Sequence, residues 1–475
     1  MSKRRTNCVV LAAGDGKRMF SKSSKVLCEV SYKPMILWVL DAAKNSGIDE
    51  ICAVISNEDV ERTVGSGIHI TYQKQRLGTG HAVGCAREFL EEHSGEETLI
   101  LYGDVPFIDV ETISESLKLH RDNNASATVI SAVIKDPTGY GRIVRKGGNI
   151  SAIVEEIDAD DATASIKEIN SGAGWFSTDD LLQSLDKISN DNAKGEYYLT
   201  DAIGIMISEG KKVAVYKSKS SDVTLGANTP LDLLNLNDIA RERILKKHLS
   251  GGVHFVSRSG ISIGPDVNIM PGAKILPGSI LYGKTSIGSG SVIGPNSLVF
   301  ESSIGKNTSF NSSQIRNSSI GDEAEIGPFV QIRPCSTISD KVKLGNFVEI
   351  KNSDIGEGTS VAHLTYIGDS DVGRYCNFGC GVVVVNYDGE EKKRTTVKDF
   401  AFVGCNTNLI SPVTVGKGAY TAAGCTVIKD IPDGALAIDR GQLNIKPGWA
   451  ANKLKKYIEK KSKLLEMNNG KSEDK

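Results

Sequence analysis

The feature that most constrains the fold is a six-residue repeat of apolar side chains in the second half of the chain. The repeat runs in one register from Ile263 to Val299, continues after a one-residue slip, and returns from Val397 to Val415. Its positions are Ile263, Ile269, Ile275, Leu281, Ile287, Ile293, Val299, Ile304, Phe310, Ile320, Ile326, Ile332, Ile338, Leu344, Ile350, Val397, Val403, Leu409 and Val415. A hexapeptide period is typical of a parallel β-helix, in which each unit forms one flat face and its apolar residue stacks on the equivalent residue of the next coil. We therefore predict a parallel β-helix within residues 251–475, followed by a C-terminal helix in "WAANKLKKYIEKKSKLLEM" and a tail.

The N-terminal segment, 1–229, has a different pattern, in which buried-strand runs alternate with helical ones. "NCVVLAA", "EICAVIS" and "TLILYGD" are typical of strands, and "PMILWVLDAAKNSG" and "GTGHAVGCAREFLEE" are typical of helices. This alternation predicts an α/β Rossmann-like domain over this segment, with a mostly parallel sheet that binds its ligand beyond the carboxyl ends of the strands. Residues 230–250 have helical spacing and no glycine, which predicts a linker helix.

The charge balance limits the kinds of partner. The 56 Lys and Arg residues nearly match 58 Asp and Glu residues, giving a formal net charge of −2. Such a balance argues against a nucleic acid or an anionic membrane as the partner. The nine cysteines are scattered without a CxxC pair, and the apolar stretch near the N-terminus is too short for a membrane span. We expect reduced thiols and a cytoplasmic location.

A glycine turn follows the first predicted strand, in "VVLAAGDGKRM". It lacks the third glycine of a dinucleotide fingerprint, and Arg18 rather than Ser or Thr follows Lys17, so it is not a P-loop. The basic pair predicts an anionic ligand of another kind. Asp104, at the end of the strand run "TLILY", is suited to Mg²⁺ that arrives with phosphates, although such a "YGD" also ends strands in ordinary turns.

Two segments interrupt the repeat with reactive or charged side chains. "VAHLTYIGD" contains His363 and Tyr366, and "VNYDGEEKKRTTV" forms a polar loop that leaves the repeat between Val385 and Val397. A single histidine is more often packed or at the surface than catalytic. No zinc motif includes His363, so its functional alternative is a general base.

A series of motifs carries a resemblance to a known family. They are "LAAGDGKRM", "LGTGHA", "LYGDVP", "PTGYGRI", "EIN", "NAKGEYYLTD", "LGNFVEIK", "HLTYIGD", "NYDG" and "SPVTVGKGA". In this order they resemble, over nearly the whole chain, the bifunctional N-acetylglucosamine-1-phosphate uridylyltransferases and glucosamine-1-phosphate N-acetyltransferases. The resemblance implies a nucleotidyltransferase domain followed by a left-handed parallel β-helix, and a homotrimer with acetyl-transfer sites between subunits. It also implies synthesis of UDP-N-acetylglucosamine for peptidoglycan and the cell wall, by acetylation and then uridylyl transfer.

The resemblance assigns residues of the first half to a uridylyltransferase site. In-line attack of a sugar phosphate on the α-phosphorus of UTP would release pyrophosphate there, with Mg²⁺ bound by Asp104 and Asn228. The sugar would be held by Gly141, Glu155, Asn170 and Asn228. The uridine nucleotide would be held by Leu11, Ala12, Ala13, Gly14, Arg18, Lys25, Gln73, Gly78, Thr79, Tyr102 and Gly103.

The resemblance assigns a second set of residues to an acetyl-transfer site. His363 would be the general base that makes the amine of glucosamine-1-phosphate nucleophilic toward the thioester of acetyl-CoA. The sugar phosphate would be bound by Arg333, Lys351, Tyr366 and Asn377. Acetyl-CoA would be bound by Cys380, Asn386, Tyr387, Cys405, Ala423 and Arg440.

The sequence departs from the family pattern at four of the compared positions. Lys17 and Ser24 stand where a small residue and Pro are usual, a difference that bears on triphosphate affinity. Cys380 and Cys405 stand where Ala and Ser are commoner, and a thiol is the weaker hydrogen-bond donor.

Two alternative functions stay open at this point. The β-helix could be a non-catalytic assembly or regulatory module, which would have no need of His363, Tyr366, Asn386 and Arg440. The whole chain could instead be a nucleotide-sugar-binding scaffold, which would have no need of the metal-ligand pair Asp104 and Asn228.

Overall fold

The computed structural model describes residues 5–14, 24–192, 195–441 and 445–469. The chain divides into two compact units, residues 1–322 and 323–475. Each unit is described here by itself.

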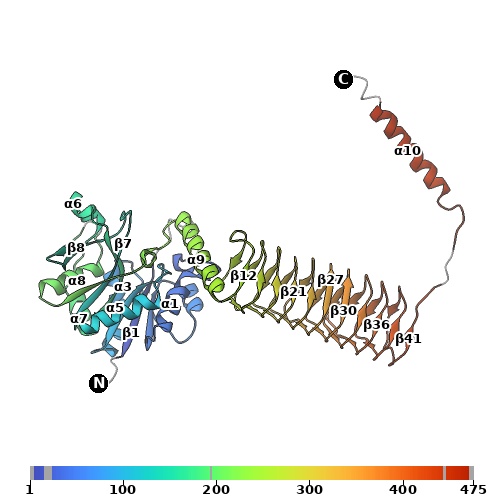
Figure 1. The fold of residues 1–475 in the computed structure, drawn as a ribbon, viewed down its shortest axis with the longest axis horizontal. Coiled ribbons are helices and arrows are strands. Elements are labelled where there is room, and N and C mark those ends of the chain that lie inside the picture. The colour runs from blue at the N-terminus through green and yellow to red at the C-terminus, as the bar shows by residue number, and fades with distance from the viewer. Residues whose placement is uncertain (1–4, 15–23, 193–194, 442–444, 470–475) are drawn as a thin grey trace. The chain divides into compact units, whose positions relative to one another are not determined.

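The first unit begins with a mixed sheet in the order β11-β7-β10-β6-β1-β4-β5 (Figure 1). Strand β1 lies parallel to both β4 and β6, whereas β10 lies antiparallel to β6 and β7. The strands are β1 (Thr6–Ala12), β4 (Glu50–Ile55), β5 (His69–Tyr72), β6 (Glu97–Tyr102), β7 (Ala127–Val133), β10 (Glu168–Ser177) and β11 (Val213–Lys217). A hairpin of β8 (Arg142–Lys146) and β9 (Asn149–Val154) joins the sheet through β10, and β2 (Glu29–Val30) pairs with β3 (Lys33–Pro34).

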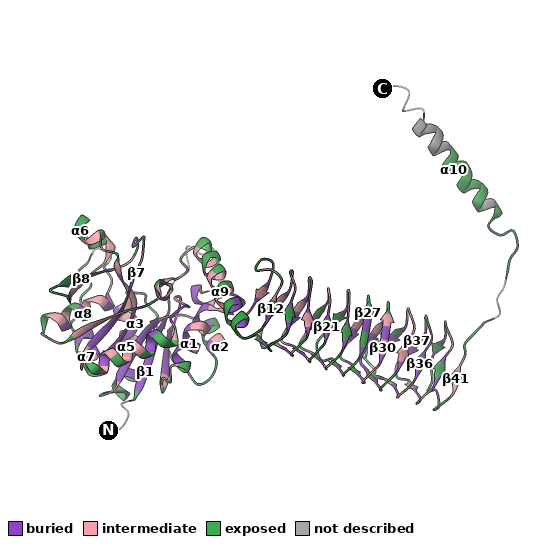
Figure 2. Ribbon diagram, viewed as in Figure 1, coloured by how far each residue is buried: buried purple, intermediate pink, exposed green. Residues whose placement is uncertain are grey.

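Helices of this unit pack on both faces of the sheet, so the core has two layers. One layer includes Val10 and Ile36, and the other includes Val9 and Leu90, because successive strand residues point to opposite faces. Figure 2 shows the central strands buried and the outer helical surfaces exposed. The helices are α1 (Met35–Asn45), α2 (Glu58–Val64), α3 (Thr79–Cys85), α4 (Arg87–Glu92), α5 (Val110–Asp122), α6 (Asp161–Ala164), α7 (Thr178–Leu185) and α8 (Leu199–Ser208). The α/β domain predicted from the alternating pattern is confirmed.

The helix predicted at residues 230–250 is α9 (Pro230–Ser250). Its N-terminus is fixed by a capping box, in which the Thr229 side chain accepts from the backbone N–H of Asp232 and the Asp232 carboxylate accepts from that of Thr229. The same carboxylate accepts from the backbone N–H of Asn228 at 2.9 Å. The capping box therefore also positions the residue that precedes the helix.

The first unit continues into short parallel strands that form three sheets, in the orders β12-β15-β18-β21, β13-β16-β19-β22 and β14-β17-β20-β23. These strands are β12 (His254–Phe255), β13 (Ser262–Ile263), β14 (Asn268–Ile269), β15 (Lys274–Ile275), β16 (Ile280–Tyr282), β17 (Ser286–Ile287), β18 (Val292–Ile293), β19 (Leu298–Phe300), β20 (Ser303–Ile304), β21 (Ser309–Phe310), β22 (Gln314–Arg316) and β23 (Ser319–Ile320).

The second unit repeats the same architecture in the orders β24-β27-β30-β33-β36-β39-β41, β25-β28-β31-β34-β37-β40 and β26-β29-β32-β35-β38. Its strands are β24 (Glu325–Ile326), β25 (Gln331–Ile332), β26 (Thr337–Ile338), β27 (Lys343–Asn346), β28 (Glu349–Lys351), β29 (Asp354–Ile355), β30 (Ser360–His363), β31 (Tyr366–Gly368), β32 (Ser370–Val372), β33 (Asn377–Phe378), β34 (Val383–Val385), β35 (Thr395–Val397), β36 (Phe402–Val403), β37 (Asn408–Ile410), β38 (Thr414–Val415), β39 (Tyr420–Thr421), β40 (Thr426–Val427) and β41 (Leu436–Ala437). The predicted C-terminal helix is α10 (Ala451–Asn469), and the end of the tail, 470–475, lies outside the described residues.

The hexapeptide repeat explains why these coils form. Every repeat position named from the sequence is buried, and each lies in a short strand. Ile315, which the sequence pattern skipped, is also buried and fills the step between Phe310 and Ile320. The stacked parallel sheets confirm the β-helix and are consistent with the left-handed form that the resemblance implies. Among the described helices, none combines the length and the apolar character that crossing a membrane requires.

Candidate functional site

A cavity of about 470 Å³ opens in the first unit at the carboxyl ends of β1 and β6. It lies where the ligand of a parallel α/β sheet is expected. Among the residues predicted to hold a nucleotide or its metal, the lining includes Leu11, Ala13, Gly14, Lys25, Gln73, Gly78, Thr79, Tyr102 and Asp104. The structure thus brings together residues from several separate segments of the sequence.

Glycine is required at Gly78 on this cavity wall. Its φ is +110°, and a β-carbon there would lie 2.4 Å from the backbone oxygen of Tyr197. The Gly78 carbonyl accepts a hydrogen bond from the Gln73 side chain at 3.2 Å. This hydrogen bond holds the "LGTG" segment beside the residue that follows β5, and the backbone hydrogen bonds between Tyr197 and the residues Leu77 and Gly80 hold it beside the "EYYLT" segment.

Lys25 lies between the two residues predicted to bind Mg²⁺. Its Nζ donates to Asn228 Oδ1 at 2.7 Å and also bonds to Asp104 Oδ2. The Lys25 side chain is only 10% exposed, so its charge is balanced mainly by Asp104. A carboxylate oxygen and an amide oxygen therefore converge on one cationic position, and this donor set fits a hard divalent ion such as Mg²⁺.

Tyr102 also lines this cavity. Burial raises the pKa of its phenol far above the ordinary value, although a hydrogen bond with the Thr79 side chain acts in the opposite direction. Tyr102 therefore stays neutral at physiological pH. A β-carbon on Gly172 would lie 2.6 Å from the Tyr102 ring, which explains the glycine there.

The residues predicted to hold the sugar also meet. The Gly141 carbonyl accepts from the backbone N–H of Asn170 at 2.8 Å, and a β-carbon on Gly141 would lie 3.3 Å from Glu155 Oε1. Glu155 Oε1 also accepts from the Thr200 hydroxyl at 3.4 Å. Gly141, Glu155 and Asn170 thus lie next to one another, although none of them is among the residues that line the 470 Å³ cavity.

Two of the predicted nucleotide residues do not line the cavity, and a third lies outside the described residues. Ala12 is 1% exposed at the end of β1, behind the cavity surface. Gly103 donates its backbone N–H to the Leu11 carbonyl at 2.9 Å and holds β1 and β6 together. Arg18 lies outside the described residues, as does Lys17.

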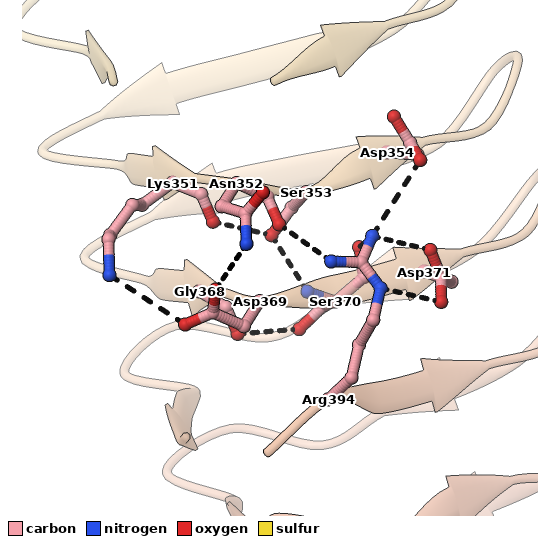
Figure 3. Close-up of polar contacts among 9 residues, drawn as sticks. All are labelled: Lys351, Asn352, Ser353, Asp354, Gly368, Asp369, Ser370, Asp371 and Arg394. Carbon is pink, nitrogen blue, oxygen red and sulfur yellow. Dashed lines mark hydrogen bonds and ion pairs between the residues drawn. The ribbon is translucent and has the colours of Figure 1, made fainter. Parts of the chain in front are cut away.

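A polar cluster in the second unit surrounds Asp369. The Asn352 side chain donates to Asp369 Oδ1 at 2.5 Å, Asn386 donates to Oδ2, and Lys351 Nζ lies 3.7 Å from Oδ2. Figure 3 shows the Lys351 and Asn352 side chains pointing toward the Asp369 carboxylate. Burial opposes ionisation, but the two amide donors and the Lys351 charge outweigh it and lower the pKa of Asp369. The carboxylate is therefore ionised and holds three side chains in place.

Tyr366 lies beside this cluster on β31. Burial raises its pKa, and the nearby charges of Glu349 and Asp369 act in the same direction, so the phenol stays neutral. Its ring occupies the space where a side chain on Gly368 would lie. Arg333 Nη1 donates to Glu349 Oε1 at 2.9 Å, and Glu349 is the direct strand partner of Tyr366. Arg333 directly follows β25, Lys351 ends β28 and Tyr366 begins β31, so the three residues lie on neighbouring coils along one sheet.

His363 belongs to a column of equivalent positions on successive coils, next to Asn346 of the preceding coil. It ends β30, and the pairing of β30 and β31 with β33 and β34 makes His363 level with Cys380. The pairings of the next two coils place Cys405 and then Ala423 in the same column. His363 and Cys405 are exposed, and Cys380 is half-buried. We name residues 363, 380, 405 and 423 the corner column, because each lies where the chain passes from one sheet to the next.

Three predicted residues lie apart from the Asp369 cluster and the corner column. Asn377 lies in β33, between Ser360 and Phe402 in register. Tyr387 is 54% exposed in the polar loop, where its hydroxyl donates to the Gly389 carbonyl at 2.5 Å. Arg440 is exposed after β41.

The polar loop after Val385 is tied to the coils by Arg394. Its guanidinium binds Asp371 at 2.6 Å and 2.8 Å and donates to the Asn352 carbonyl at 3.0 Å (Figure 3). Asp354 lies 3.7 Å from the same group. One side chain thus contacts two successive coils and holds the return of the loop beside the Asp369 cluster.

Comparison with known proteins decides the family. Residues 8–148 match a MobA-like NTP transferase domain. The bifunctional protein GlmU of Acetivibrio thermocellus is 45% identical over 94% of this chain and 97% of its own length. GlmU of Clostridium perfringens (strain ATCC 13124) is 46% identical over 94% of this chain and 98% of its own, and GlmU of a Geobacillus species is 45% identical over 91% and 95%. The chain belongs to the GlmU family. As a GlmU protein, it is a bifunctional nucleotidyltransferase and acetyltransferase of UDP-N-acetylglucosamine synthesis, which is the function expected from its motifs.

The structure adds residues that the sequence did not single out. Arg76 lines the cavity and donates its Nε to the Ala13 carbonyl at 2.9 Å, and Glu196 lines the same cavity. In the second unit, Asp369 is the centre of the polar cluster. The available signals were the Arg in "QKQRLGTG", the Glu in "KGEYY" and the first Asp of "IGDSD".

Proposed function

We propose that the cavity of the first unit carries out uridylyl transfer from UTP to N-acetylglucosamine-1-phosphate, with Mg²⁺ held by Asp104 and Asn228. The observation that supports this most is the Lys25 ammonium, which bonds to both oxygens at once. These oxygens can therefore share one cation. Bound Mg²⁺ would offset negative charge on the phosphates in the transition state.

The chain's own residues position the two reactants in this proposal. Backbone groups at Ala13 and Gly14 approach the nucleotide, and Gln73, Gly78 and Thr79 form the opposite wall. Asp104 and Asn228 would hold Mg²⁺, and Lys25 would supply a further positive charge to the triphosphate. Gly141, Glu155 and Asn170 hold the sugar so that its phosphate oxygen faces the α-phosphorus in line.

We propose that the coils around His363 acetylate glucosamine-1-phosphate before that step. His363 removes a proton from the sugar ammonium, because only the neutral amine attacks a thioester. Lys351, Arg333 and Tyr366 bind the sugar phosphate, and the Asp369 carboxylate orients Lys351 and Asn386. Acetyl-CoA lies along Cys380, Cys405 and Ala423 of the corner column and also contacts Asn386, Tyr387 and Arg440. Asn377 completes the subsite for the sugar phosphate. We further propose a cytoplasmic homotrimer in which neighbouring subunits complete each acetyl-transfer site.

One reaction mixture tests both assignments. Purified full-length protein receives glucosamine-1-phosphate, acetyl-CoA, UTP and Mg²⁺, and CoA and pyrophosphate release are followed separately. We expect both products, and no pyrophosphate when a chelator replaces Mg²⁺. A different result would contradict the second assignment: if pyrophosphate is released when N-acetylglucosamine-1-phosphate is supplied, but no CoA is released from acetyl-CoA with glucosamine-1-phosphate, the β-helix is a non-catalytic module.

A further inference from the structure

The corner column contains two thiols on adjacent coils. The Asn406 backbone N–H donates to the Cys380 carbonyl at 2.8 Å, so the coils of Cys380 and Cys405 are hydrogen-bonded at this point. Neighbouring strands in a sheet lie about 4.8 Å apart. Disulfide-bonded cysteines have Cα atoms about 4.4–6.8 Å apart, so equivalent positions on adjacent coils are within reach of a disulfide.

The Cys405 sulfur also lies close to the neighbouring coil. Its sulfur lies 2.9 Å from the point where a β-carbon on Gly379 would stand, and Gly379 directly precedes Cys380. Gly379 has no side chain, so it places no atom between the Cys405 sulfur and the backbone next to Cys380. Cys405 is exposed and Cys380 is half-buried, so a small reagent can reach the pair.

The other cysteines of the second unit are unsuited to this chemistry. Cys376 and Cys425 are 2% and 3% exposed, and burial raises the pKa of both thiols. The Cys376 sulfur bonds to the Lys398 carbonyl at 3.1 Å in the interior. Cys335 is exposed, but it occupies a different turn, the one that precedes β26.

We propose that Cys380 and Cys405 form a reversible disulfide that blocks acetyl transfer while leaving uridylyl transfer intact. The blocking half of this proposal rests on the proposed function, because it requires the acetyl donor to run along the corner column. Each thiol gives up one hydrogen, and the two electrons and two protons reduce a low-molecular-weight disulfide such as oxidised glutathione to two thiols. An exposed bond of this kind is readily reduced again.

Peptide mapping tests the bond itself. Full-length protein is treated with oxidised glutathione, alkylated without reduction and digested with trypsin. We expect a linked species that joins peptide 375–392, which carries Cys376 and Cys380, to peptide 399–417, which carries Cys405. The Cys376→Ser variant must keep this link and the Cys380→Ala variant must lose it. Glutathione adducts on separate peptides, with no linked species, would overturn the proposal.

Activity measurements test the consequence. Each protein is compared with its own reduced sample, so a change in basal rate in a variant does not enter the ratio. Oxidation should lower acetyl transfer by on the order of tenfold through misplacement of the donor, leave uridylyl transfer within error, and be reversed by dithiothreitol. Cys335→Ser must retain this sensitivity, and Cys405→Ser must lose it. If the linked species forms and acetyl transfer is unchanged, the blocking role is wrong. If the reduced protein shows no acetyl transfer, the proposed function is contradicted, and peptide mapping alone then tests the disulfide.

Discussion

The two candidate sites place their residues in opposite ways. Around the cavity of the first unit, distant segments meet at one point, as Lys25 and Asn228 do from opposite ends of the α/β domain. In the second unit, functional positions recur at coil spacings, as the corner column does with His363, Cys380 and Cys405. A repeat of this kind depends mainly on neighbouring coils. Substitutions in the column should therefore act locally, whereas substitutions at the cavity should disturb several segments together.

The sharpest test of this contrast is His363→Ala. Loss of a general base typically costs about 10²- to 10⁴-fold in rate. We expect acetyl transfer to fall by that factor and uridylyl transfer to stay unchanged, with the two products assayed separately. His254→Ala, at another exposed histidine, is the control and should leave both rates alone. A fall in both activities in folded His363→Ala protein would contradict the separation of the sites.

The reciprocal change is Asp104→Ala. Removing one charge-stabilising group from a phosphoryl-transfer site costs on the order of 10²- to 10³-fold. Uridylyl transfer should fall by this amount at saturating UTP, while CoA release stays at the wild-type rate. The control is Asp59→Ala, which removes an exposed carboxylate on α2. Retention of uridylyl transfer by Asp104→Ala would exclude the proposed metal ligand.

Lys25→Met separates nucleotide binding from metal binding. Loss of one charge-assisted contact to a phosphate should raise the KM for UTP about tenfold. The same change removes the ammonium that bonds to Asp104 and Asn228, so Mn²⁺ should bind more tightly to the variant than to wild type in the absence of nucleotide. Electron paramagnetic resonance of free Mn²⁺ measures this directly. Lys44→Met, at an exposed lysine in α1, should change neither value, and weaker Mn²⁺ binding by Lys25→Met would contradict the shared position.

Asp369→Asn should have the smallest effect, and this effect should depend on pH. Because the folded-state pKa is lowered, the carboxylate contributes stability above its unfolded-state pKa, near 4, and loses it as pH falls through the lower folded-state value. We expect a loss of about 1 kcal/mol at pH 7 that shrinks below about pH 4. Thermal unfolding across this range measures it. Asp354→Asn, at an exposed carboxylate, is the control, and a pH-independent difference would count against an ionised Asp369.

The sequence was most informative where a local rule repeats. A strand of each coil needs one apolar residue pointing inward, so the period alone located the β-helix and the buried side chains of most coils. The period was lost around Ile315 because the step from Phe310 is one residue shorter there, although Ile315 is fully buried. The mixed character of the first sheet was also hidden, because the residues of β10 do not indicate in which direction the strand pairs with β6 and β7.

The site residues that the sequence missed depend on contacts between coils or loops. Asp369 looks like an ordinary turn residue in "IGDSD", and only the spacing to Asn352 and Asn386 in the folded coils gives it three partners. Arg76 lies in a polar stretch with no motif of its own, and its role as a cavity residue comes from the backbone of Ala13. Asp104 and His363 were singled out from their place in the sequence, whereas the roles of the other motif residues came from the family resemblance rather than from a physical rule.

The polar loop after Val385 has a consequence for how this fold can vary. The coil that contains it is longer than the coils before and after it, because the whole loop lies between β34 and β35, yet strand pairing resumes in register on both sides. Extra chain can therefore be accommodated at this point without disturbing the strands above or below. The exposed part of the loop, residues 387–392, can therefore vary in length and charge more freely than the coils, and an engineer could insert a binding peptide there for the same reason.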